Sequence, residues 1–311
     1  MFRRHVGPME PVRNGVCGDW RLPDEAFLAS FHLPSADRVE VLAAKNPMPR
    51  EARIHFDESA HTYTVDGLTV PRSATGLVHK YVKEFDAQAA IDAMKGSARW
   101  HHKHEEFMED GVLMNDERIA SLWAFRGEVA RARGTLLHYH AECYLNGREI
   151  EEPHSAEFKQ FLLIYDAVIR DKMEVYRTEV NIFHCGLRCA GQPDCLCRDA
   201  EGRIIVFDWK RCAAIKTDSP QQMRPPLEHL ADCNFNTYAL QLNLYRFQLE
   251  SEYGFAVSKM YLGVVHPSRL LPQVLEIPRL DAEIAELVEH EITIGCATDA
   301  RPGPDAALSL L

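Results

Sequence analysis

The sequence predicts a mixed α/β (α+β) fold, in which helices flank a central β-sheet. Residues 174–210 contain three apolar segments with a period of two, which is typical of strands. Amphipathic helical segments precede them, and a further helix separates them from two more strands. The 311 residues suffice for one elaborated domain with an extension.

The first part of the chain predicts an extension followed by a hairpin. Residues 1–50 are interrupted by six prolines and weakly periodic, so we expect an arm or a short helical extension there. Asp66 and Gly67 form a hairpin turn, and Ser73 is a candidate N-cap of the next helix. We predict strands over residues 53–56, 61–65 and 68–70.

The middle of the chain predicts two helical regions and then the sheet. Asn115 or Asp116 begins a long helical stretch, which we expect Gly134 to interrupt, and Ser155 begins another helix. We predict helices over residues 134–145, 155–171, 238–253 and 281 to about 294, and strands over residues 174–183, 187–197, 203–210, 259–266 and 273–277. The main domain should span residues 51–296, followed by a flexible tail over residues 297–311.

Charge and composition exclude several classes of protein. The formal net charge of −11 argues against a protein that coats duplex DNA by electrostatics alone. No apolar run is long enough to cross a bilayer, and the N-terminal residues lack the apolar block of a secretory signal. The nine cysteines do not suggest a disulfide framework. We therefore expect a soluble intracellular protein without a membrane partner.

Two carboxylates and a lysine are predicted to lie close together on neighbouring strands. Side chains alternate along a strand, so Asp208 and Lys210 share one face while Trp209 points to the other. If the strands are antiparallel, Asp194 lies beside Asp208. Two such carboxylates repel each other unless a cation such as Mg²⁺ or Mn²⁺ neutralises them. The alternative is that Asp194 caps a turn and that Asp208 and Lys210 form a surface ion pair.

Two helical segments carry further polar pairs with a spacing of four residues. His138 and Glu142 lie on one helical face, and Thr135 lies one turn earlier. The simpler interpretation of His138 is a structural histidine between helix and sheet. Gln241 and Tyr245 repeat the spacing on the helix after Lys210, where a helix with a polar edge is the alternative.

Taken in order, the segments GTLLHYHAE, GQPD, FDWK and QLNLY resemble the RecB-type branch of the PD-(D/E)XK nucleases. The mitochondrial genome maintenance exonuclease and the lambda-type exonucleases are related to this branch. The resemblance covers roughly residues 53–280 and implies a restriction-endonuclease-like mixed sheet core flanked by helices. Asp208 stands where many members have glutamate.

The resemblance also implies roles for individual residues. The metal ligands would be His138, Asp194, Asp208, the backbone carbonyl of Trp209, and Glu179. The catalytic residues would be Lys210 with Asp208 and Asp194, supported by Gln241, Tyr245 and Glu142. We expect DNA contacts from Arg133, Thr135, Arg211, Lys216, Ser73 and Thr75. Candidate base-stacking side chains are Trp209, Tyr238 and Tyr245, although the simpler interpretation is that most of these aromatic residues lie in the core.

The expected function is that of a metal-dependent DNA nuclease hydrolysing phosphodiester bonds, an exonuclease on single-stranded DNA or DNA ends in replication, repair or recombination. The alternatives are an RNA endonuclease of the cap-snatching type and an inactive nucleic-acid-binding module. The expected cofactor is Mg²⁺ or Mn²⁺. We expect no iron–sulfur cluster, because Cys296 alone follows Cys233, and no nucleotide cofactor, because there is no phosphate-binding loop. DNA is the expected partner, with a helicase, recombinase or replication protein acting in trans.

Overall fold

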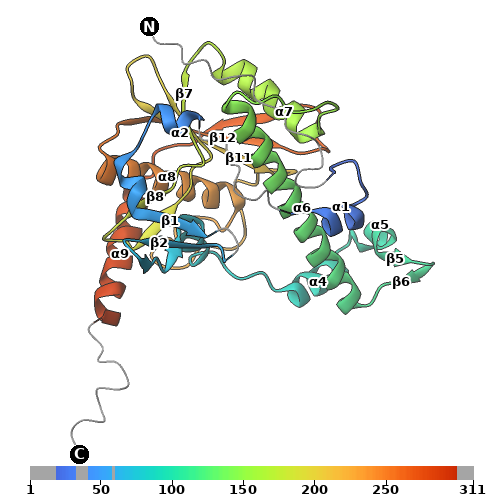
Figure 1. Ribbon diagram of the computed structural model, residues 1–311. Helices are drawn as coiled ribbons and strands as arrows, with labels where there is room; N and C mark the ends of the chain where they lie inside the picture. The colour runs from blue at the N-terminus through green and yellow to red at the C-terminus, as the bar shows by residue number, and fades with distance from the viewer. Residues whose placement is uncertain (1–18, 33–40, 58–59, 300–311) are drawn as a thin grey trace, which may run out of the picture.

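A mixed five-stranded sheet forms the centre of the computed structural model, which describes residues 19–32, 41–57 and 60–299 (Figure 1). The strand order is β13-β12-β11-β10-β7. All neighbours are antiparallel except β11 and β12, which are parallel. The strands are β7 (Glu174–Thr178), β10 (Cys195–Arg198), β11 (Ile204–Arg211), β12 (Val257–Val265) and β13 (Gln273–Glu276). The predicted mixed sheet with flanking helices is confirmed.

Helices cover both faces of this sheet, which explains why six consecutive residues of β11 are buried. On one face α8 (Asn234–Tyr253) packs over Val206 and Leu262. On the other face, Phe207 and Trp209 lie in an apolar cluster with residues of α6 (Asp116–Leu145) and α7 (Ala156–Ile164), and α7 continues into a π-turn at Tyr165–Ile169. Each strand therefore alternates between two apolar layers.

Two further sheets have three strands each. One has the order β4-β9-β8, with β4 (Arg72–Ser73), β8 (Ile182–His184) and β9 (Cys189–Gly191), and the other has β1 (Ile54–Asp57), β2 (Thr62–Val65) and β3 (Leu68–Thr69). The predicted continuous strands over residues 174–183 and 187–197 are therefore wrong, because each is split between two sheets. The first breaks at Glu179, which has a left-handed φ of 45°, and the second breaks around Pro193, which has no N–H to donate.

Helix α6 runs unbroken through Gly134, so the predicted interruption is also wrong. A glycine inside a helix costs only about 1 kcal/mol, which the packing of a 30-residue helix can offset. The predicted caps are confirmed: Asn115 accepts a hydrogen bond from the Arg118 N–H, and Ser155 accepts one from the Phe158 N–H. Ser73 likewise caps α3 (Ala74–His79) through the N–H of Gly76.

The N-terminal half of α6 carries a small helical arm that extends away from the sheet (Figure 1). The arm consists of α4 (Ala87–Lys95), α5 (Trp100–Lys103), a 3₁₀ turn at His104–Phe107, and the hairpin of β5 (Met108–Glu109) and β6 (Val112–Leu113). Ile91, Phe107 and Ile119 join it to α6 in a separate apolar cluster. The arm therefore has a core of its own.

The extension before the domain is helical where the structure describes it, with α1 (Asp24–Ser30), α2 (Val41–Lys45) and a 3₁₀ turn at Pro49–Arg53. At the other end, α9 (Asp281–Asp299) continues past its expected end near Ile294, and the remainder of the predicted tail lies outside the described residues. None of the helices in the described ranges is both long enough and apolar enough to cross a lipid bilayer.

A buried carboxylate fixes α9 to the segment around α3. The Glu291 side chain is only 3% exposed, lies 2.6 Å from Lys80 Nζ, and also binds Arg72 and the Tyr81 hydroxyl. Burial acts to raise the pKa of Glu291, but the donors Lys80, Tyr81 and Arg72 outweigh burial and lower it below its ordinary value of 4.5. A carboxylate with a lowered pKa stabilises the fold above its ordinary pKa and loses this contribution as the pH falls.

We expect Glu291→Gln to lower the free energy of unfolding by about 1–3 kcal/mol at pH 7, because charge-assisted hydrogen bonds are lost. Thermal melting of both proteins between pH 7 and pH 3 would measure the effect. The difference should shrink as the pH falls below 4.5. Glu289→Gln, on the exposed face of the same helix, is the control, and a pH-independent difference would contradict the assignment.

Candidate active site

One face of α6 forms the wall of a cleft of about 790 Å³. Glu128, Arg131, Thr135, His138 and Glu142 all line it, and their spacings of three and four residues place them on a single helical stripe. The other walls include the end of β11, with Trp209 and Lys210, and the turn after β7, with Glu179. The helix thus brings its predicted histidine to the edge of the central sheet.

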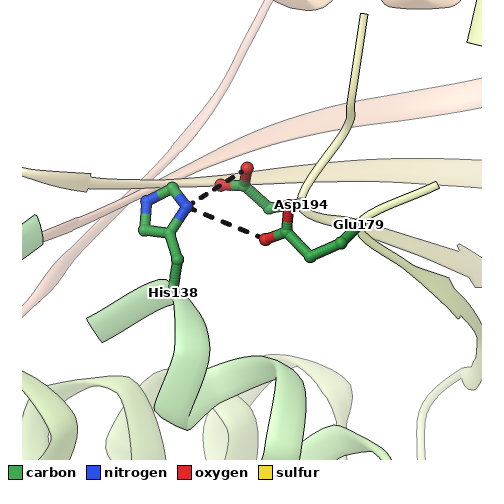
Figure 2. A group of neighbouring side chains, drawn as sticks. All are labelled: His138, Glu179 and Asp194. Carbon is green, nitrogen blue, oxygen red and sulfur yellow. Dashed lines mark ion pairs between the residues drawn. The ribbon is translucent and has the colours of Figure 1, made fainter. Parts of the chain in front are cut away.

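His138 converges with the carboxylates of Glu179 and Asp194 (Figure 2), and His138 and Glu179 line this cleft. The His138 Nδ1 atom lies 3.5 Å from Asp194 Oδ1 and 3.8 Å from Glu179 Oε1, and the candidate ligand atoms of the three residues all lie within 4.8 Å of one another. The His138 Nε2 atom is 2.9 Å from the carbonyl oxygen of Trp209. When Nε2–H donates to this carbonyl, Nδ1 has its lone pair directed at the carboxylates.

The backbone around Glu179 and Asp194 holds the two carboxylates in place. The Glu179 N–H donates to the Asp194 carbonyl at 3.1 Å, and Gln192 Nε2 donates to the Glu179 carbonyl at 3.0 Å. Asp194 Oδ2 accepts a hydrogen bond of 2.6 Å from the Trp209 N–H. The left-handed conformation of Glu179 costs of order 1–3 kcal/mol and is characteristic of functional sites.

Asp208 and Lys210 form a buried pair next to this cluster. Asp208 is 1% exposed, and Lys210 Nζ lies 2.6 Å from its Oδ2, yet neither carboxylate oxygen accepts a well-aligned hydrogen bond from the described residues. Burial raises the pKa of Asp208, and the neighbouring Asp194 carboxylate raises it further. Burial alone would lower the pKa of Lys210, but the Asp208 and Asp194 carboxylates raise it, so the ammonium group stays charged.

The donor set fits a divalent cation that prefers oxygen ligands. Two or three carboxylates and one imidazole nitrogen suit Mg²⁺ or Mn²⁺, and the nitrogen favours Mn²⁺. The unsatisfied oxygens of Asp208 fit the same conclusion, because a buried carboxylate beside a second one needs positive charge in excess of one lysine. Asp208 lies beside the converging set and not within it, since its Oδ2 contacts Lys210.

The predicted polar pair on α8, Gln241 and Tyr245, lies close to Asp208. Gln241 Nε2 donates to the Tyr245 hydroxyl at 2.8 Å and to Thr75 Oγ1 at 3.1 Å. Burial raises the pKa of Tyr245 well above its ordinary value, and the Asp208 carboxylate contributes to the rise. Tyr245 is therefore a neutral hydroxyl close to Asp208, and Thr75 braces Gln241.

Close packing of β9 against Tyr245 gives a testable prediction. A Cβ atom added at Gly191 would lie 2.5 Å from Tyr245 Cε1 and 3.3 Å from the Ala74 Cβ. We expect Gly191→Ala to displace the Tyr245 ring and to lower the free energy of unfolding by about 1–3 kcal/mol. Thermal melting would measure this, with Gly127→Ala on α6, where a Cβ meets nothing, as the control. Unchanged melting would show that the ring has room to move.

The expected DNA contacts are placed differently from one another. Arg133 donates to Asp24 and to the carbonyls of Trp20 and Leu22, so it anchors α1 and does not line the cleft. Arg211 lines the cleft but pairs with Glu157 at 2.8 Å. Thr135 lines the cleft, while its hydroxyl bonds the Arg131 carbonyl. The remaining three residues do not line the cleft. Lys216 is exposed on a loop, Ser73 caps α3, and Thr75 accepts a hydrogen bond from Gln241.

Several further predictions are refined by the geometry. Glu142 lines the cleft one turn after His138, but its carboxylate is not part of the converging set. Trp209 and Tyr245 are buried in the core, in agreement with the simpler interpretation, and are unsuited to stacking on bases. The sequence interpretation missed Arg131 and Gln192. The stripe of spacings that ends at His138 and Glu142 would have revealed Arg131.

The comparisons with known proteins identify distant structural similarity only. No family model matches the chain, and no curated protein matches it. An alkaline exonuclease from Laribacter hongkongensis is similar with 16% identity and a TM-score of 0.29, over 71% of this chain and 90% of that one. A "Putative exonuclease" from Eubacterium rectale is similar with 14% identity and a TM-score of 0.32, over 53% of this chain and 65% of that one. Both neighbours are described as exonucleases, but similarity this low does not assign the chain to a family.

Proposed function

We propose that this protein is a metal-dependent DNA nuclease of the RecB-type PD-(D/E)XK class. The observation that carries the proposal is the convergence of His138, Glu179 and Asp194 beside the buried pair of Asp208 and Lys210. A structural role would not require two buried acids and an ammonium group at the mouth of a cleft.

The residues have distinct proposed roles. His138, Glu179 and Asp194 would hold the cation, with Asp208 completing the negative charge around it. A bound divalent cation would bind a phosphate oxygen and lower the pKa of a water molecule. Lys210, which stays protonated, would orient the attacking water or donate a proton to a phosphate oxygen.

The Trp209 carbonyl and Glu142 have supporting proposed roles. The Trp209 carbonyl, also expected to be a ligand, orients His138 through its hydrogen bond to Nε2. Glu142 would act from the cleft wall on the water or on the leaving group. Gln241 and Tyr245 would support Asp208 and Lys210 from α8, on one face of the sheet.

The proposed substrate is single-stranded DNA or a DNA end. The candidate site lies in a cleft and not on an open surface, so the DNA would have to enter this cleft. The chain would act in replication, repair or recombination, with a helicase or recombinase supplying unwound strands. The alternative of RNA cleavage uses the same residue types and differs in the sugar it accepts.

The decisive experiment measures cleavage of end-labelled single-stranded DNA, duplex DNA and RNA of the same sequence, in EDTA, Mg²⁺ or Mn²⁺. We expect DNA cleavage that requires Mg²⁺ or Mn²⁺ and releases short products from an end. Cleavage of RNA alone would support the RNA endonuclease instead. Intact substrates under every condition would overturn the proposal.

A further inference from the structure

The cleft that contains His138 is also lined by aromatic and apolar side chains. Leu28 and Phe31 come from α1 and its C-cap, and Phe56 and His61 come from β1 and the turn before β2. Leu28, Phe31 and Phe56 are only partly buried, although each joins an apolar cluster. The same cleft therefore offers apolar surface as well as the acidic site.

The rings of Phe31 and Phe56 each pack against a second aromatic ring. The Phe31 ring centroid lies 5.4 Å from that of Phe27, which is fully buried against α6. The Phe56 ring stacks on Tyr63 with a centroid distance of 4.4 Å and an interplanar angle of 28°. Side chains held in this way lose little conformational entropy when a ligand binds.

Helix α1 is itself fixed on α6 by Arg133. Its guanidinium group lies 2.7 Å from Asp24 Oδ1, donates to the Trp20 carbonyl at 3.0 Å, and lies 4.5 Å from the centroid of the Phe27 ring. The position of Phe31 is therefore set by the same helix that carries His138. The extension is part of the wall of the cleft.

Charge is distributed along the cleft in a way that suits a nucleotide. Arg131 lies on the cleft stripe seven residues before His138, at a rise of about 10 Å along the helix. Its side chain is exposed, and its guanidinium makes no ion pair with the described residues. A ligand that contacts both Arg131 and the rings of Phe31 and Phe56 in this cleft needs a phosphate and a flat apolar group. An unpaired nucleotide has both, whereas the faces of a base inside a duplex are covered by its neighbours.

We propose that Phe31 and Phe56 form a stacking site for an unpaired base, next to a phosphate held by Arg131, in a single strand bound along α6. The inference rests on the proposed function for the identity of the strand that enters the cleft. It deepens that function by assigning the recognition of unpaired bases to Phe31 of the N-terminal extension together with Phe56 of β1. The site differs from Trp209 and Tyr245, which the sequence suggested for stacking.

The test compares binding of two fluorescently labelled single strands in EDTA, one of normal DNA and one of the same length with abasic sites throughout. We expect Phe31→Ala to weaken binding of the normal strand about 5- to 100-fold, which equals about 1–3 kcal/mol. Binding of the abasic strand should not change, because its phosphates are intact. Phe56→Ala, on β1, should give the same base-dependent loss, and Phe31→Tyr should retain binding.

The matched control is Phe85→Ala, which removes an exposed phenylalanine that precedes α4 and does not line the cleft. Equal losses for both strands, or no loss for either, would overturn the inference. Because binding is measured without metal, its outcome is independent of cleavage. If the protein cleaves nothing but shows the base-dependent loss, the stacking site is supported and the nuclease proposal is refuted. If the protein cleaves DNA but shows no base-dependent loss, the nuclease proposal is supported and the stacking site is refuted.

Discussion

Asp194→Asn should abolish DNA cleavage, with a loss of at least about 1000-fold, or about 4 kcal/mol in the barrier. The amide oxygen can still accept the hydrogen bond from the Trp209 N–H, so the fold should persist. What is lost is the negative charge 3.5 Å from His138 Nδ1, where the cation would bind. Cleavage of end-labelled DNA in Mn²⁺ would measure the rate.

Thermal melting with and without Mn²⁺ would show whether the loss lies in cation binding. Wild-type protein at 100 times its Kd for Mn²⁺ should gain about 2.7 kcal/mol of stability, and Asp194→Asn should gain much less. Glu201→Gln, in the exposed turn between β10 and β11, is the matched control and should behave as wild type. A variant that cleaves normally would remove Asp194 from the site.

Lys210→Met should reduce cleavage by about 100- to 10,000-fold while preserving the stabilisation by Mn²⁺. Methionine has a similar length and keeps the apolar part of the side chain, but it removes the ammonium group 2.6 Å from Asp208. The proposed ligands His138, Glu179 and Asp194 remain, so the cation should still bind. Cleavage assays and melting in Mn²⁺ would separate the two effects.

Lys159→Met removes an exposed lysine of α7 and is the control for loss of positive charge. If Lys210→Met lost the Mn²⁺ shift together with cleavage, the lysine would be needed for assembly of the site. Normal cleavage by Lys210→Met would exclude any role for the ammonium group in the reaction.

The period of the apolar residues was enough to predict the central sheet and the alternation of side chains between its two faces. It placed Asp208 and Lys210 on one face and Trp209 on the other, as their partners in the structure require. Capping residues located the starts of α6 and α7 correctly, because a side-chain acceptor for the first N–H groups is a local requirement. Such features depend on neighbours within a few residues.

Features that depend on distant contacts could not be predicted in this way. The left-handed turn at Glu179 is held by the carbonyl of Asp194 and the side chain of Gln192, which are remote in the sequence. Arg133 was expected to contact DNA because it is basic and close to His138, but its partners lie on α1, over 100 residues earlier. The break expected at Gly134 ignored the tertiary packing that outweighs intrinsic propensity.

Because α6 is continuous, it fixes the rotational orientation of the arm relative to the cleft about the helix axis. Ile119 anchors the arm and His138 anchors the site on one rigid rod, and each residue inserted between them would rotate one end by 100° relative to the other. A single insertion would turn His138 away from Glu179 and Asp194, whereas seven added residues would restore its direction to within about 20°. The segment between Ile119 and His138 can therefore change only by numbers of residues close to whole helical turns, such as seven or eleven.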